Sequence, residues 1–200
     1  MPRVLSKEEV EDFREKLTEA ATRLFAERGQ DGFTLRELAA EVGVSPMTPY
    51  RYFKDKDDIL AAVRARAFDR FAEKLENAFG KKGSPIERAV AAAEAYVEFA
   101  LEETPAYRLM FDIWQPSGND YPDLVRASIR ARATMVQHIP GLVEAGVLEG
   151  DPVLIGHVFW SALHGAVMLR LAGKLSPECD FQKLIDETMR ALSVGFAPRR

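Results

Sequence analysis

The sequence carries repeated signals for the start of a helix and no sustained signal for a β-strand. Three times a Ser or Thr is followed three residues later by Glu, in the pairs Ser6 with Glu9, Thr34 with Glu37 and Ser84 with Glu87. In such a capping box, each side chain accepts the free backbone N–H of the other residue, so the pattern marks a helix N-terminus. No stretch alternates apolar and polar residues over the length of a strand. We therefore predict an all-α fold of nine or ten helices.

A domain boundary is predicted at the segment GKKGSP, residues 80–85, which combines two glycines, two lysines, a serine and a proline. It divides the 200 residues into a small N-terminal part and a larger C-terminal part. We predict a small helical domain of three helices at residues 1–54, a connecting helix at 55–79 and a larger helical domain at 84–200.

Residues 34–53 have the pattern of a helix-turn-helix, with Gly43 in the turn. Ser45 can cap the second helix with Pro46 at its first position, where a missing N–H is harmless. A second proline, Pro49, follows three residues later and leaves two alternatives. Either the helix starts at Ser45 with a tight, 3₁₀-like first turn, which we favour, or Thr48 is the cap and Pro49 the first residue, since proline disfavours helical geometry at the residue before it.

The segment PYRYFKDK, residues 49–56, interleaves aromatic and basic residues. We expect Phe53 to face inward, and Tyr50, Arg51, Lys54 and Lys56 to supply groups that bind phosphate. Arg36, early in the preceding helix, is positioned to reach guanine. The pattern predicts a protein that binds double-stranded DNA through the major groove.

Composition excludes several other classes. The formal net charge of −4 gives no sign of nucleic-acid binding for the whole chain, so the basic residues must act locally. A single cysteine, Cys179, excludes an internal disulfide framework and fits a reducing cytoplasm. Three scattered histidines and the lack of a Gly-rich phosphate loop offer no metal site, cofactor site or catalytic group. We expect a cytoplasmic, nucleoid-associated protein that is not an enzyme.

The stretch from about residue 13 to residue 60 resembles the DNA-binding domain of the tetracycline-repressor (TetR) family of bacterial transcriptional regulators. The matching pieces are AATRLFAERGQDGFTLRELAAEVGVS, a Thr and a Tyr two apart, and YFKDKDDIL. The resemblance implies an all-helical dimer that binds a palindromic operator through its N-terminal domain and a small molecule through its C-terminal domain. The positions that match the family's DNA contacts are Thr34, Arg36, Pro46, Met47, Thr48, Tyr50, Arg51, Tyr52 and Lys56.

The chain departs from the family pattern at Pro49, where the family usually has Leu, Ile or Val packed onto the neighbouring helices. Pro46 and Met47 present only apolar surface, so we expect them to contact a thymine methyl group.

The C-terminal half resembles one TetR subgroup that is named for a Trp-x-x-x-His-Gly signature, here Trp160, His164 and Gly165. Family likeness predicts a ligand cavity among the helices between residue 84 and about residue 173. Aromatic and sulfur-containing side chains with few charges favour a mostly apolar ligand, although most of them suit a plain core equally well. The candidates for ligand binding are Tyr96, Phe99, Tyr107, Met110, Phe111, Trp114, Met135, His138, Trp160, His164 and Met168.

Residues 153–169 carry no Asp, Glu, Lys or Arg. A membrane span needs about 20 apolar residues, so this shorter run with two histidines favours a helix buried on most of its circumference, with a membrane span as the alternative. Family likeness places the helices at about 152–173 and 178–195 in a dimer interface, which would cover the face that the chain itself leaves open.

We therefore predict a dimeric repressor that a small-molecule effector releases from its operator. The alternatives are a DNA-binding dimer without ligand control, and a helical binding protein or enzyme with no DNA role.

Overall fold

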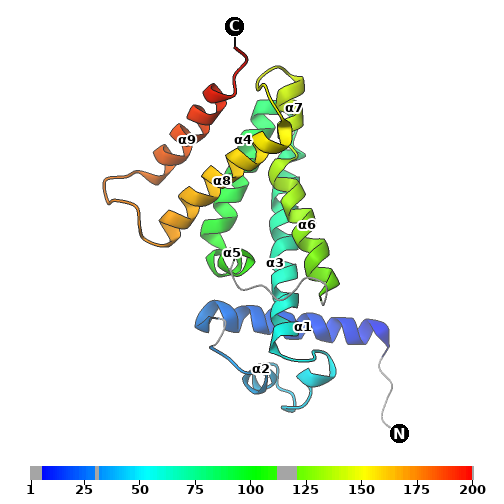
Figure 1. The fold of residues 1–200 in the computed structure, drawn as a ribbon. Coiled ribbons are helices and arrows are strands. Elements are labelled where there is room, and N and C mark those ends of the chain that lie inside the picture. The colour runs from blue at the N-terminus through cyan, green and yellow to red at the C-terminus, as the bar shows by residue number, and fades with distance from the viewer. Residues whose placement is uncertain (1–5, 30–31, 112–120, 200) are drawn as a thin grey trace. The chain divides into compact units, whose positions relative to one another are not determined.

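The computed structural model in Figure 1 describes residues 6–29, 32–111 and 121–199, and in these residues every regular element is a helix. The prediction of an all-α fold is confirmed. The elements are α1 (Lys7–Arg28), α2 (Leu35–Glu41), the 3₁₀ helix η1 (Pro49–Arg51), α3 (Lys56–Phe79), α4 (Pro85–Glu102), α5 (Thr104–Phe111), α6 (Pro122–Val136), α7 (Ile139–Glu144), α8 (Pro152–Leu171) and α9 (Phe181–Gly195).

The three capping boxes start α1, α2 and α4 as predicted. At Ser6 the hydroxyl accepts the N–H of Glu9 at 3.1 Å, and the Glu9 carboxylate accepts the N–H of Ser6 at 2.8 Å. The same reciprocal pairs form at Thr34 and Ser84. Each box satisfies backbone donors that have no partner inside the helix.

Contacts within the chain define two compact units. Unit 1 comprises Met1–Phe68 and Pro105–Ser128, and unit 2 comprises Asp69–Thr104 and Ile129–Arg200. All three limits between the units fall inside helices, in α3, α5 and α6. This division therefore differs in kind from the predicted domain limits at residues 54 and 84, which stay predictions.

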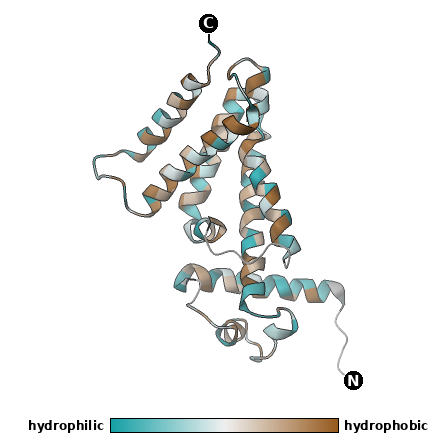
Figure 2. Cartoon of the chain, viewed as in Figure 1, coloured by the Kyte–Doolittle hydropathy of each residue, from teal (hydrophilic) through white to brown (hydrophobic). Residues whose placement is uncertain are grey.

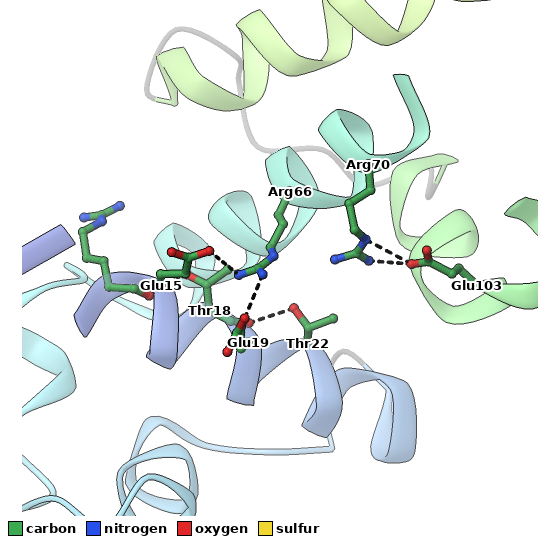
Figure 3. A network of polar contacts seen from close by, with 8 residues as sticks. Glu15, Thr18, Glu19, Thr22, Arg66, Arg70 and Glu103 are labelled. Carbon is green, nitrogen blue, oxygen red and sulfur yellow. Dashed lines mark hydrogen bonds and ion pairs between the residues drawn. The ribbon is translucent and has the colours of Figure 1, made fainter. Parts of the chain in front are cut away.

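The core of unit 1 gathers apolar residues from α1, α2, the C-terminal flank of η1, α3 and α5, among them Leu17, Leu38, Phe53, Ile59 and Leu109. A buried cation reinforces it. Arg64 on α3 is 2% exposed and donates from Nε to the carbonyl of Leu109 at 2.7 Å. On the surface, Arg66 pairs with Glu15 and Glu19 of α1 at 3.3 and 2.8 Å (Figure 3). Exposed pairs of this kind contribute little, about 0–1 kcal/mol each.

Unit 2 has its own core, which includes Ile139, Leu142, Leu148 and Ile155. Lys74 of α3 pairs with Glu102 of α4 at 2.8 Å. Arg70 of α3 donates to the carboxylate of Glu103, the residue that follows α4 (Figure 3).

Helix α8 is long and apolar enough to cross a membrane by length and composition alone. Inside the chain, 28% of its most apolar window is buried. Hydrophobic segments recur along α8 and α9 in Figure 2. The expectation that α8 is buried on most of its circumference is therefore wrong for the single chain, in which apolar residues such as Val153, Leu154 and Leu169 stay exposed.

Candidate functional site

The segment that follows α2, residues 45–53, is called the recognition segment below. Its backbone is wound more tightly than the α-helix that we predicted from Ser45. Gly43 makes the turn with φ of 71°, a conformation that suits glycine. The Thr48 N–H then donates to the Ser45 carbonyl at 2.9 Å, which closes a 3₁₀-type turn, and η1 follows at Pro49. The first alternative, a tight 3₁₀-like turn at Ser45, is correct for this turn. The second alternative, with Thr48 as the cap and Pro49 as the first residue, is correct for the start of the helix. A continuous α-helix from Ser45 does not form.

Pro49 explains this geometry. Pro49 is buried, so it occupies the position at which the family resemblance implies a packed aliphatic residue. Proline cannot donate to the Ser45 carbonyl, and Thr48 donates there in its place. Thr48 keeps helical dihedrals of φ −64° and ψ −45°, so our expectation that Pro49 disfavours them is wrong here. Packing of the buried ring outweighs a local preference that is modest in size.

Arg14 on α1 holds the end of this segment, a role that the sequence did not reveal. Its Nη1 donates to the Tyr52 carbonyl at 2.7 Å, and its guanidinium carbon lies 4.4 Å from the centre of the Phe53 ring. Phe53 is buried, as predicted. The contact spans 38 residues of sequence, so no local pattern signals it.

The predicted DNA contacts differ in how openly they are presented. Met47 is 68% and Tyr50 is 51% exposed, large values for apolar and aromatic side chains. Six others are also exposed or half-exposed without a core role: Thr34, Arg36, Pro46, Thr48, Arg51 and Lys54.

Two of the predicted DNA contacts, Tyr52 and Lys56, already contact aromatic rings of the protein itself. Tyr52 packs against the Phe13 ring at 4.7 Å, and the Lys56 ammonium lies 5.0 Å from the centre of the Phe33 ring. Their assignment to DNA stays a prediction, as it does for the other eight.

The cationic side chains near the recognition segment differ in whether an acidic side chain pairs with them. Arg36 and Arg51 are exposed and have no acidic partner among the described residues. Arg28, by contrast, is engaged with Glu37 at 3.4 Å. Thr34 is engaged too, because its hydroxyl donates to Glu37 at 2.9 Å within the capping box. Arg36 and Arg51 are therefore the side chains best able to approach a phosphate or a base edge.

Unit 2 contains a cavity of about 250 Å³. Of the predicted ligand-binding residues, it includes Tyr96, Met135, His138 and Trp160. The cavity also includes residues that the sequence did not single out: Leu75, Ile86, Ala89, Val90, Ala92, Ala93, Thr134, Ile139, Leu142, Val147, Leu148, Phe159, Leu163, Met189 and Ser193.

The remaining ligand candidates lie elsewhere. Phe99 packs edge-on against Phe71, and His164 does not line the cavity but is hydrogen-bonded to the Tyr96 hydroxyl. Tyr107, Met110 and Phe111 belong to unit 1, and Met168 does not line the cavity. Trp114 lies outside the described residues.

A chain of polar groups borders the cavity. The Trp160 Nε1–H donates to the Tyr96 hydroxyl at 3.3 Å, and that hydroxyl bonds to Nδ1 of His164 at 3.1 Å. Burial lowers the pKa of His164, and it lowers the pKa of His138 to about 4. Burial therefore favours the neutral form of both imidazoles. No group of His, Cys, Asp or Glu that could hold a metal ion occurs in the described ranges.

Comparison with known proteins decides the family. Residues 17–63 match the family described as "Bacterial regulatory proteins, tetR family", and residues 89–192 match "Tetracyclin repressor-like, C-terminal domain". The chain belongs to the TetR family. It is a transcriptional regulator with a helix-turn-helix DNA-binding domain, and not an enzyme. The Trp-His-Gly subgroup stays a prediction.

Relatives of this TetR-family chain agree. An uncharacterized HTH-type transcriptional regulator of Mycobacterium tuberculosis is 26% identical over 93% of this chain and 82% of its own length. The HTH-type transcriptional regulator BetI of Brucella anthropi is 30% identical over 58% of this chain and 61% of its own length.

Solved structures share the fold. A protein of unknown function from a Rhodococcus species matches with a TM-score of 0.82 and 26% identity, covering 99% of this chain and all of that one. The TetR-family regulator PfmR of Thermus thermophilus matches with a TM-score of 0.66 and 23% identity over 92% of this chain and 99% of its own.

Proposed function

We propose that this TetR-family regulator is a repressor that binds a palindromic operator as a homodimer and leaves it when a small, mostly apolar effector binds in unit 2. The observation that carries the DNA-binding part is the exposed tip of the recognition segment. Met47 and Tyr50 lie open to solvent, and the exposed Arg36 and Arg51 have no acidic partners in the described chain.

The side chains at this tip suggest how bases are read. Arg36 is the main candidate for a bidentate contact with guanine, and the methyl-bearing Met47 suits a thymine methyl group. Tyr50, Arg51 and Lys54 then hold phosphates on either side, which fixes the register without reading sequence. Because the whole chain carries a net charge of −4, we expect weak non-specific binding that falls steeply with salt.

Dimerisation is supported by the apolar surface that α8 and α9 leave open. Val153, Leu154 and Leu169 on α8 and Val194 on α9 are exposed in the single chain. Permanent interfaces between protein copies are large and hydrophobic, and a second copy would cover this surface. A dimer places its two recognition segments in successive major grooves when they are about 34–36 Å apart.

Effector control is supported by the cavity of unit 2 and by helix α3. Leu75 of α3 lines the cavity, and the same helix begins at Lys56, next to the recognition segment. We propose that effector binding favours a conformer in which α3 holds the two recognition segments at a different spacing. A coupling free energy of about 1–3 kcal/mol changes operator occupancy roughly 5- to 150-fold.

The test is fluorescence anisotropy with the promoter fragment of the protein's own gene. We expect Arg36→Ala and Tyr50→Ala to weaken binding by about 5- to 100-fold, since each removes a base or phosphate contact. Sedimentation should show the same dimer for both variants. The matched control is Arg23→Ala on α1, an exposed arginine that pairs only loosely with Glu41 at 3.8 Å and should leave affinity unchanged. Unchanged affinity in both recognition variants contradicts the proposed docking.

A further inference from the structure

The size of the cavity in unit 2 limits what it can hold. Its volume is about 250 Å³. An apolar cavity of about 150 Å³ holds one benzene molecule, so this one has room for about ten non-hydrogen atoms. The aromatic and aliphatic residues that line it make close, dry contact favourable for a hydrocarbon body.

The charge of the lining limits the occupant further. Among the described residues that line the cavity there is no Lys, Arg, Asp or Glu. Arg88 lies on α4 between two lining residues but does not itself line the cavity. Its guanidinium carbon lies 4.9 Å from the centre of the Phe79 ring, and its buried Nε has no hydrogen-bond partner among the described residues. A carboxylate or ammonium group entering the cavity would give up its hydration without gaining an opposite charge, which is costly.

The polar groups of the lining are mostly engaged with one another. Thr134 donates to the Ala131 carbonyl at 2.7 Å, and Ser193 donates to the Met189 carbonyl at 2.8 Å. The Trp160 N–H donates to the Tyr96 hydroxyl, which is also hydrogen-bonded to His164. His138 differs, because its buried Nδ1 has no hydrogen-bond partner in the part of the chain that the structure describes.

We propose that the cavity selects an uncharged molecule of about ten non-hydrogen atoms, with a hydrocarbon body and a single polar group that hydrogen-bonds to the imidazole of His138. The inference rests on the proposed function, in which this cavity is the effector site. The neutral imidazole offers one N–H donor and one acceptor nitrogen, so an alcohol or a carbonyl oxygen suits it.

Three probes of similar size test the selectivity: 1-octanol, which is neutral with one hydroxyl; n-butylbenzene, which has no polar group; and octanoate, which is anionic. Binding to the purified full-length protein is measured by isothermal titration calorimetry at pH 7.5. We expect 1-octanol to bind at least about tenfold more tightly than octanoate, because the anion loses hydration without compensation. Equal or tighter binding of octanoate, or no binding of 1-octanol, overturns the proposal.

Two variants at one position test the hydrogen bond. His138→Leu should weaken 1-octanol by about fivefold and leave n-butylbenzene unchanged, because only the alcohol uses the imidazole. His138→Gln keeps a donor and an acceptor and should retain 1-octanol within about twofold. His138→Leu also removes a buried unpartnered nitrogen, so the variant should fold. Equal weakening of both probes in His138→Leu contradicts the assignment.

A charge added at the edge of the cavity tests the exclusion of anions. Ile86 lines the cavity and is 51% exposed, so it accepts a polar side chain without unfolding. Ile86→Lys should raise octanoate affinity by about fivefold, and the matched Ile86→Gln should not. The absence of any gain in Ile86→Lys shows that charge is not what bars the anion.

Operator binding measured separately distinguishes the two proposals. If the protein binds its operator but not 1-octanol, the DNA-binding function is supported and the proposal for the cavity is wrong. If the protein binds 1-octanol with the expected selectivity but binds no operator, the proposal for the cavity is supported and the proposed function is wrong.

Discussion

Single residues decide the geometry of the recognition segment. Pro49 removes a backbone donor, and its ring is buried where an aliphatic side chain would pack. Arg14 then secures the following residues by a hydrogen bond to Tyr52 and by stacking over Phe53. Proline also restricts the unfolded chain, so ordering this segment costs less conformational entropy than it would for a flexible loop.

Arg14→Met should lower the free energy of unfolding by about 1–3 kcal/mol, because it removes a charged hydrogen bond to a backbone carbonyl and a cation–π contact. Urea denaturation followed by circular dichroism measures this. Arg23→Met is the control on the same helix, since its contact with Glu41 is long and exposed. A loss that is the same in both variants would show that Arg14 has no special role.

His138 should make stability depend on pH. Burial lowers its folded-state pKa to about 4, below the ordinary value of 6.5, so folding favours the neutral ring. The stabilisation is full above pH 6.5 and is lost as pH falls from 6.5 towards 4, by an amount that approaches ~3 kcal/mol. Thermal denaturation across this range should show a shallower slope for His138→Gln than for the unmodified protein. Identical slopes would contradict the burial of an unprotonated ring.

Helices begin where local side chains satisfy the backbone. The boxes at Ser6, Thr34 and Ser84 depend on residues three apart, so they form in any fold that permits the helix. Helix α6 ends at Val136, and Pro140 lies in the first turn of α7, where its missing N–H is not needed.

Ser84→Ala should lower the free energy of unfolding by about 1 kcal/mol, because the N–H of Glu87 loses its acceptor. Chemical denaturation measures the change. Ser128→Ala is the matched control, since Ser128 lies within α6 and donates only to the Val125 carbonyl, where alanine is at least as good a helix former. A cap that contributes nothing would leave the two variants equally stable.

At the scale of the whole molecule, apolar surface left open by one chain indicates a partner. Leu154 on α8 is 59% exposed, and Ile129 on α6 is 56% exposed, so the two positions are alike in the single chain. Only the first lies on the pair of helices that we propose as the dimer interface.

Leu154→Glu should therefore shift the protein from dimer to monomer, because it places a charge where the partner would exclude water. Ile129→Glu should leave the dimer intact. Sedimentation equilibrium at micromolar concentration separates these outcomes. A dimer that survives Leu154→Glu, or dissociates in Ile129→Glu, would place the interface elsewhere.

The sequence by itself determined the helical fold, the three capped starts and the open recognition tip, because these depend on residues a few positions apart. Tertiary structure decided the rest. The cavity draws residues from α3, α4, α6, α7, α8 and α9, and only four of the candidates named from sequence line it. Arg14 reaches a segment 38 residues away. Such contacts depend on how distant helices pack, and aromatic and methionine residues at helical spacing have the same pattern whether they face a cavity or fill a core.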